Sequence, residues 1–247
     1  MGRKRLTLAT ERGPVSMLPR ILCAVVVDVS ASTFASGALD TIVAALPQFR
    51  DSVLKDSLLT RKLSWAIVAF SDTTQVLFPY GPVTEWEVPQ TLEHGNGTAM
   101  ATAIIETIHL QAEHMEDLGE QGIPVQHKLI FLVTDAYANN EPPERLDEAA
   151  ELIAEAEKHD FSFFGIGVEG ADMNMLRRLT PRRTPLRLAD VNDFAKFFAW
   201  LNASLRTVSV SQPGERYKLP DPMKTKPRKE SNGKQSEPEN PIGWGEI

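Results

Sequence analysis

Apolar runs that fit buried strands alternate with amphipathic helical patterns along most of this chain. Each run is long enough for one buried strand and too short to cross a membrane. These runs span residues 21–28, 64–71, 128–135 and 161–168. Helical spacing of apolar residues covers 37–55, 99–115, 145–159, 172–180 and 192–208. Strands that alternate with helices predict an α/β fold, a three-layer, doubly wound (Rossmann-like) sandwich around a mostly parallel sheet.

Two local features modify this pattern. Residues 74–80 fit an antiparallel hairpin partner of the second strand, placed at the sheet edge and closed by Gly81 and Pro82. Pro47 lies inside the helical pattern of residues 37–55. Because proline has no N–H to donate, it predicts a kink or break near Leu46.

The folded part is expected to cover residues 20–210. Residues 1–19 fit a flexible N-terminal segment. From about Ser211 the chain is rich in Pro, Lys, Glu and Ser and poor in apolar residues, so 211–247 is predicted to be disordered. Within it, the segment PIGWGEI (241–247) contains an aromatic anchor that fits a docking motif or a segment that folds back on the domain.

Composition and charge narrow the classes of function. The net charge of −7 argues against general affinity for nucleic acid or an anionic membrane. The single cysteine, Cys23, lies inside an apolar strand, so we expect a small core residue and no disulfide within the chain. We find no pattern of a secretory signal or a membrane-spanning segment, and we therefore expect a cytoplasmic protein.

Side chains with oxygen donors gather where the predicted strands end. Asp28 ends the first strand and is followed by Ser30 and Ser32, while Asp135 ends the third buried strand. Thr98 follows a glycine-rich loop that opens a helix. If the first and third strands are neighbours, both carboxylates lie at the sheet edge where open α/β sheets bind ligands.

These five residues offer only hard oxygen donors. Such donors suit Mg²⁺, Mn²⁺ or Ca²⁺ and not zinc, and they leave one coordination position for an acidic ligand from outside. Each residue alone also fits a turn or a helix cap. The same character at three separate segments favours a metal site.

The motif DVSAS (28–32) resembles the DxSxS signature of von Willebrand factor type A (VWA) domains, which carries their metal-ion-dependent adhesion site (MIDAS). Thr98 in GNGTAM and Asp135 in FLVTDA resemble the threonine and aspartate of the family's second and third loops. The resemblance covers roughly residues 20–210. It implies a non-enzymatic module whose metal ion binds an Asp or Glu of a partner protein.

Residues 194–211 are similar to the last helix of bacterial VWA proteins of the TerY/YegL type, which belong to tellurium-resistance gene clusters. That resemblance implies a role in stress response or signalling, with a kinase or phosphatase as partner. One residue departs from the family pattern, because Ala136 follows Asp135 where glycine is usual. Alanine adopts a left-handed φ less readily, so the third loop is expected to take a slightly different path.

Other hypotheses compete with a binding module. A Mg²⁺- or Mn²⁺-dependent phosphohydrolase would use the same cluster, but the strand ends show no further acid or lysine to act on a phosphate. Residues 165–170 match GxGxxG, with Asp190 at about the distance of a dinucleotide fingerprint, or they are small residues that let a helix approach. The histidines lack the spacing of a zinc hydrolase. Five arginines in 177–187 form either a solvated surface loop or a docking patch for an acidic partner.

Overall fold

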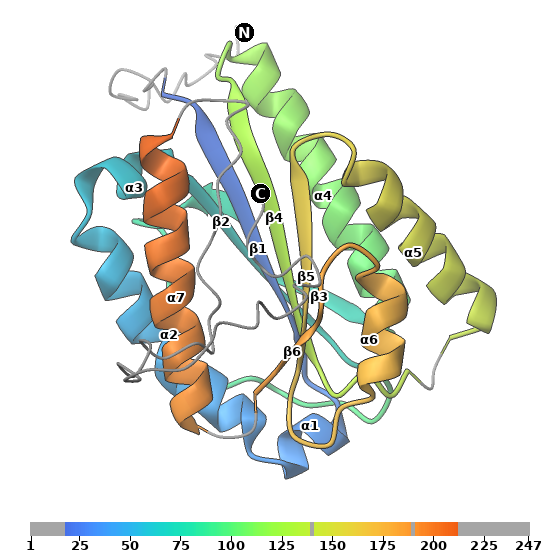
Figure 1. Cartoon of the computed structure of the whole chain (residues 1–247). Helices are drawn as coiled ribbons and strands as arrows, with labels where there is room; N and C mark the ends of the chain where they lie inside the picture. The colour runs from blue at the N-terminus through green and yellow to red at the C-terminus, as the bar shows by residue number, and fades with distance from the viewer. Residues whose placement is uncertain (1–17, 139–140, 189–190, 212–247) are drawn as a thin grey trace, which may run out of the picture.

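The computed structural model describes residues 18–138, 141–188 and 191–211, without the side chains of residues 191 and 192. Within these residues, six strands form one sheet in the order β3-β2-β1-β4-β5-β6 (Figure 1). The strands are β1 (Arg20–Asp28), β2 (Leu63–Phe70), β3 (Thr74–Pro82), β4 (Val125–Thr134), β5 (Phe161–Gly167) and β6 (Leu186–Arg187). The helices are α1 (Ala31–Ala35), α2 (Ala38–Leu54), α3 (Ser57–Lys62), α4 (Met100–Glu120), α5 (Pro143–Ala156), α6 (Met173–Leu179) and α7 (Val191–Val210).

The sheet has the predicted topology. β1 pairs in parallel with β2 and β4, β4 pairs in parallel with β5, and β5 with β6. β3 is antiparallel to β2 and forms the predicted edge strand. Since β1 and β4 are parallel neighbours in register through Val27 and Val133, the residues that follow them emerge at one edge. We call this edge the carboxyl edge of the sheet.

Helices cover both faces of the sheet, which explains why its central strands are apolar throughout. On one face Cys23, Val25 and Val27 of β1 pack in the core beneath α2 and α7, so Cys23 is the core residue that was expected. On the other face Leu22 and Val26 pack in the core beneath α4, α5 and α6. Figure 1 shows the two helical layers on either side of the sheet.

Pro47 does not break α2, so a break near Leu46 is wrong, and the kink given as its alternative stays a prediction. One helix runs from Ala38 to Leu54 with Pro47 inside it. Pro47 is exposed on the helix surface, whereas Leu46 and Phe49 are buried in the core. Water can therefore satisfy the carbonyl that proline leaves without a partner, while the packed face holds the helix together.

The remaining elements are short. The last strand, β6, has only two residues. The short helices α1 and α3 were not expected, and α3 is capped by Asp56, whose Oδ1 accepts from the N–H groups of Leu58 and Leu59 at 3.1 and 3.0 Å. The predicted flexible segment and the Pro- and Lys-rich tail fall almost entirely outside the described residues. No helix in the described part of the chain is long and apolar enough to span a bilayer.

Candidate metal centre

The first loop of the candidate site (residues 28–32) is organised around the carboxylate of Asp28. This side chain is fully buried where β1 ends. Its Oδ1 accepts a hydrogen bond from the N–H of Ser30 at 2.8 Å, and its Oδ2 accepts one from the hydroxyl of Thr134 at 2.5 Å. Asp28 therefore folds its own loop and ties it to the end of β4. Thr134 was missed in the sequence, where it reads only as a strand residue next to Asp135.

Two serine hydroxyls continue from the buried carboxylate toward the surface. Ser30 is buried and Ser32 is exposed, and their Oγ atoms lie 3.2 Å apart. Neighbouring oxygen ligands of an octahedral Mg²⁺ ion are about 3.0 Å apart, since each bond is about 2.1 Å long. The two hydroxyls thus have the spacing that adjacent ligands of one small divalent cation need.

The second loop (residues 92–98) lies directly against the first. The N–H of Gly95 donates to the carbonyl of Val29 at 3.0 Å, and Ser30 and Gly95 form an isolated parallel bridge. Thr98 is buried at the end of this loop, just before α4 begins. The structure therefore brings Thr98 to the carboxyl edge, beside the first loop.

Asp72 fixes the second loop by hydrogen bonding to its backbone. The sequence analysis did not single out this residue. Its Oδ2 accepts from the N–H of Asn96 at 2.9 Å. Bonds from the N–H groups of Asn96 and Gly97 lower the pKa of Asp72 below its ordinary value. A Cβ at position 95 would lie 2.6 Å from Asp72 Oδ2 and closer still to Ser71 Oγ, so any larger residue would force the loop or these side chains to shift.

The third loop (residues 135–138) turns sharply after Asp135. Asp135 is buried, and its Oδ1 accepts from the N–H of Tyr137 at 3.1 Å. Ala136 has φ +62°, which is the left-handed conformation, and its N–H donates to Thr134 Oγ1 at 2.8 Å. Ala136 therefore holds a conformation that costs alanine more than glycine, and the different path expected of this loop stays a prediction.

Glu141 links the region after the third loop to α4. Its two carboxylate oxygens accept from the N–H groups of Ala101 and Thr102, both at 2.7 Å. These are two of the N–H groups that the first turn of a helix leaves without a partner. Glu141 thereby holds the start of α4, three residues beyond Thr98.

The buried carboxylates of the site favour a bound cation. Burial raises the pKa of Asp28, the hydrogen bonds from Thr134 and Ser30 lower it, and the nearby Asp135 raises it further. Two carboxylates are thus buried close together without a cationic side chain among those causes. Among the described residues, no group of three or more His, Cys, Asp or Glu side chains could hold a metal ion. Further ligands would be hydroxyls and water, the donor set of a hard divalent cation.

The GxGxxG motif of residues 165–170 serves close packing in this structure. A Cβ at Gly167 would lie 2.7 Å from Met173 Sδ and 2.8 Å from Ala171 Cβ, so the glycine lets α6 approach β5. Asp190, the acid that the dinucleotide hypothesis used, lies outside the described residues.

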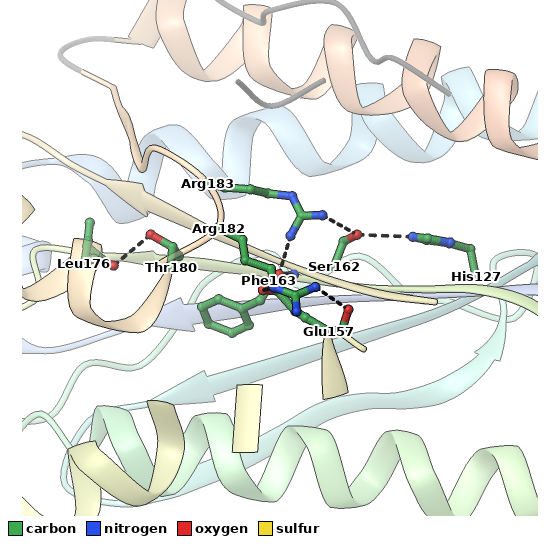
Figure 2. Close-up of polar contacts among 8 residues, drawn as sticks. All are labelled: His127, Glu157, Ser162, Phe163, Leu176, Thr180, Arg182 and Arg183. Carbon is green, nitrogen blue, oxygen red and sulfur yellow. Dashed lines mark hydrogen bonds and ion pairs between the residues drawn. The ribbon is translucent and has the colours of Figure 1, made fainter. Parts of the chain in front are cut away.

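The arginine-rich segment 177–187 is only in part the solvated surface that the sequence predicted. The side chain of Arg183 is 10% exposed and forms an ion pair with Glu157, whose side chain is 2% exposed (Figure 2). Arg178 pairs with Asp147 on the surface at 2.7 Å. Arg183 is therefore not part of a solvated surface, whereas the other four arginines of the segment are exposed, and the docking patch stays a prediction.

Arg183 belongs to a polar cluster at the opposite, amino edge of the sheet, where β4 and β5 begin. Its guanidinium donates to Ser162 Oγ at 3.0 Å, and His127 Nε2 lies 3.3 Å from the same oxygen (Figure 2). Glu157 Oε1 also accepts from the N–H of Phe163 at 3.2 Å. Burial is the main cause that lowers the pKa of His127 to about 4. We call these four side chains (His127, Glu157, Ser162 and Arg183) the amino-edge cluster.

Comparison with protein families gives one match that covers most of the folded part. The model of the von Willebrand factor type A domain matches residues 24–200. Comparison with curated proteins gives no match.

Several solved structures share this fold. A von Willebrand factor type A protein from Catenulispora acidiphila is 18% identical, with a TM-score of 0.56 over 81% of this chain and 45% of that one. The vWF domain of the type V pili tip protein Mfa5 from Porphyromonas gingivalis is 12% identical, with a TM-score of 0.58 over 80% and 98%. Proximal thread matrix protein 1 from the mussel byssus, with a zinc occupied MIDAS motif, is 16% identical, with a TM-score of 0.50 over 78% and 47%. The chain spans about half the length of the first and third of these, and identities this low show the fold alone.

Proposed function

Because the chain belongs to the von Willebrand factor type A family, we propose that it is a non-enzymatic, metal-dependent protein interaction module. Its metal would be held by two carboxylates and three hydroxyls at the carboxyl edge. These residues are Asp28, Ser30, Ser32, Thr98 and Asp135. The ion would be Mg²⁺, Mn²⁺ or Ca²⁺, and a partner protein would present an Asp or Glu to it.

The observation that carries this proposal is the way two buried carboxylates meet at one edge. Thr134 hydrogen-bonds to Asp28 across the gap between β1 and β4, and Asp135 follows Thr134 directly. The Ser30 and Ser32 hydroxyls lie beside them at ligand spacing. When bound, a divalent cation supplies a Lewis acid that attracts a carboxylate from outside, while the chain's own acids balance its charge.

The relatives support an interaction role over turnover. One structural neighbour is a pili tip protein and another is described with a zinc occupied MIDAS motif. The zinc in the mussel protein, which is 16% identical to this chain, supports a divalent metal on this fold. We extend the proposal to a TerY/YegL-like protein that works in a bacterial stress response, with a kinase or phosphatase as partner, on the resemblance of residues 194–211.

Selection of peptides tests capture of an acid. A library of random heptapeptides displayed on phage is bound to the immobilised chain in Mg²⁺ and eluted with EDTA. We expect the eluted sequences to contain Asp or Glu almost without exception, and Asp28→Ala to retain none of them. Asp51→Asn, which removes an exposed acid on α2, should select the same peptides as the wild type.

Two outcomes would contradict the proposal. Peptides recovered equally well with EDTA present throughout would show binding that needs no metal. Hydrolysis of p-nitrophenyl phosphate that requires Mg²⁺ or Mn²⁺ and is lost in Asp28→Ala would favour the phosphohydrolase instead.

A further inference from the structure

Exposed aromatic rings lie close in the sequence to the candidate metal ligands. Four large hydrophobic side chains are exposed among the described residues, and two of them, Phe34 and Tyr137, lie two residues beyond candidate ligands. Phe34 follows Ser32 and is 46% exposed, and Tyr137 follows Asp135 and is 56% exposed. Because a globular protein usually buries such rings, their place beside the site indicates a contact surface.

The ring from the second loop completes this surface. His94 is exposed and stacks on Phe34, with 4.2 Å between the ring centroids and 22° between the ring planes. The Tyr137 hydroxyl donates to the carbonyl of Gly170 at 3.2 Å, which fixes the direction of its ring. The second and third loops thus contribute one ring each, and α1, which follows the first loop, contributes the third. We call Phe34, His94 and Tyr137 the aromatic rim.

The charges beside the rim limit what it can receive. Three exposed acids lie near the rim. Glu93 precedes His94, Glu169 precedes Gly170, which bonds to Tyr137, and Asp72 bonds to the second loop at Asn96. A ligand with a run of acids would be repelled by them. A single carboxylate between apolar side chains fits better, because the acid can reach the metal while its neighbours cover the rings.

This chain contains such a segment. In residues 241–247, Glu246 is the one acid, and Trp244 and Ile247 flank it. α7 ends at Val210 at the amino edge, where Gln126 Nε2 donates to the carbonyl of Val208 at 2.7 Å. The 20 residues of α7 span about 30 Å. Glu246 lies 35 positions after Ser211 in the sequence, and a chain of that length can reach up to about 115 Å. The segment can therefore return to the carboxyl edge of its own molecule.

We infer that the carboxylate of Glu246 binds the metal ion of its own chain, with Trp244 and Ile247 against Phe34 and Tyr137. This inference rests on the proposed function, because it needs a metal at the candidate centre. Segment 241–247 would then occupy the site until a partner with a better-fitting acidic segment displaces it. The module would be self-inhibited.

The fluorine NMR spectrum of the full chain labelled with 5-fluorotryptophan tests this inference. The chain has four tryptophans, and the three described ones (Trp65, Trp86 and Trp200) are buried. Trp244→Phe assigns the remaining resonance. Mn²⁺ is the probe, since it broadens the signal of a nearby fluorine, and Mg²⁺ gives the diamagnetic reference.

We expect one equivalent of Mn²⁺ to broaden the Trp244 resonance beyond detection in the wild type and to leave it sharp in Glu246→Gln. Glu239→Gln, a change of another acid in the same stretch of sequence, should behave as the wild type does. Combined Phe34→Ala and Tyr137→Ala should restore a sharp Trp244 resonance while Mn²⁺ still binds. Val76→Ala, which shortens an exposed hydrophobic side chain on β3, should change nothing.

The free Mn²⁺ signal in electron paramagnetic resonance separates the ways to fail. If Mn²⁺ stays free, the proposed function and this inference are both wrong. If Mn²⁺ binds and the Trp244 resonance stays sharp, the inference is wrong and the proposed function stands. If labelled Asp28→Ala chains lose their Trp244 resonance when unlabelled wild-type chains and Mn²⁺ are added, the segment binds another copy and the intramolecular contact is wrong.

Discussion

The two edges of the sheet bury carboxylates next to groups of opposite charge: another acid at one edge and an arginine at the other. At the carboxyl edge burial raises the pKa of Asp28, and the nearby Asp135 raises it further. At the amino edge Glu157 is buried against Arg183, which in turn contacts Ser162. The amino-edge cluster supplies its own cation, and the carboxyl edge gathers oxygen donors around an acid pair. A buried carboxylate therefore indicates a ligand site only where the fold does not also supply its counter-charge.

The largest effect we expect is from the loss of Arg183. Arg183→Met leaves the buried Glu157 carboxylate with only the half-exposed Arg182, whose Nε lies 3.7 Å from Oε2. The change should lower the free energy of unfolding by up to about 3–5 kcal/mol. Urea unfolding measures it. The matched control is Arg178→Met, which breaks an ion pair whose side chains are 56% and 64% exposed and should cost less than about 1 kcal/mol. Equal effects of the two changes would show that the amino-edge cluster does not depend on its internal cation.

The second prediction concerns acid. Burial lowers the pKa of His127 from 6.5 to about 4, Arg183 and Lys128 lower it as well, and Asp160 opposes them. The unfolded chain therefore binds a proton at His127 between pH 6.5 and 4 that the folded chain does not. Above pH 6.5 His127 is neutral in both states and costs no stability. As the pH falls from 6.5 to 4, the free energy of unfolding should decrease by about 3 kcal/mol in all.

Urea unfolding at a series of pH values measures this loss. His127→Gln should flatten the profile between pH 6.5 and 4. His159→Gln, at a histidine that is 74% exposed, should leave the profile as in the wild type. An unchanged slope in His127→Gln would contradict the assignment.

A third prediction concerns the packing of the carboxyl edge. Gly95→Ala places a methyl group 2.6 Å from Asp72 Oδ2 and should push the second loop away from Val29. We expect a loss of about 1–2 kcal/mol of stability and a weaker affinity for Mn²⁺ because Thr98 moves with the loop. Gly119→Ala, at a helix position where a Cβ meets nothing within 4 Å, is the control. An unchanged metal affinity in Gly95→Ala would separate Thr98 from the site.

The smallest effect is expected at Ala136. Ala136→Gly relieves a left-handed φ that costs alanine about 1–2 kcal/mol, but glycine also gains freedom in the unfolded chain and loses a buried methyl. The net change should lie within about 1 kcal/mol. Ala136→Val should destabilise by more than this, because a β-branched side chain tolerates that φ least. If both variants unfold at the same urea concentration, Ala136 bears no strain.

Much of the fold could be predicted because the sheet is covered on both faces. That burial makes each central strand a continuous apolar run, and parallel pairing then sends Asp28 and Asp135 to one edge. In the long helices the apolar residues recur at helical spacing, which predicted them. Pro47 misled, because its place on the exposed side of α2 depends on the packing of Leu46 and Phe49 against the core.

The parts of the site that escaped prediction depend on contacts between distant residues. Thr134 bonds to Asp28 from 106 positions away, and Glu141 bonds to Ala101 from 40. Arg183 looked like part of a surface patch because its neighbours in the sequence are basic, while its partner Glu157 lies 26 positions earlier. Local patterns report which face of an element is apolar, and they do not report which polar groups the fold brings together.

A calorimetric titration of Mn²⁺ into the full chain tests the central claim most directly. We predict one site per molecule in the wild type and in Asp51→Asn, and an affinity that is weaker by about tenfold or more in Asp28→Asn and in Asp135→Asn. Wild-type affinity in both ligand variants, or no binding to the wild type, would contradict a metal centre at the carboxyl edge.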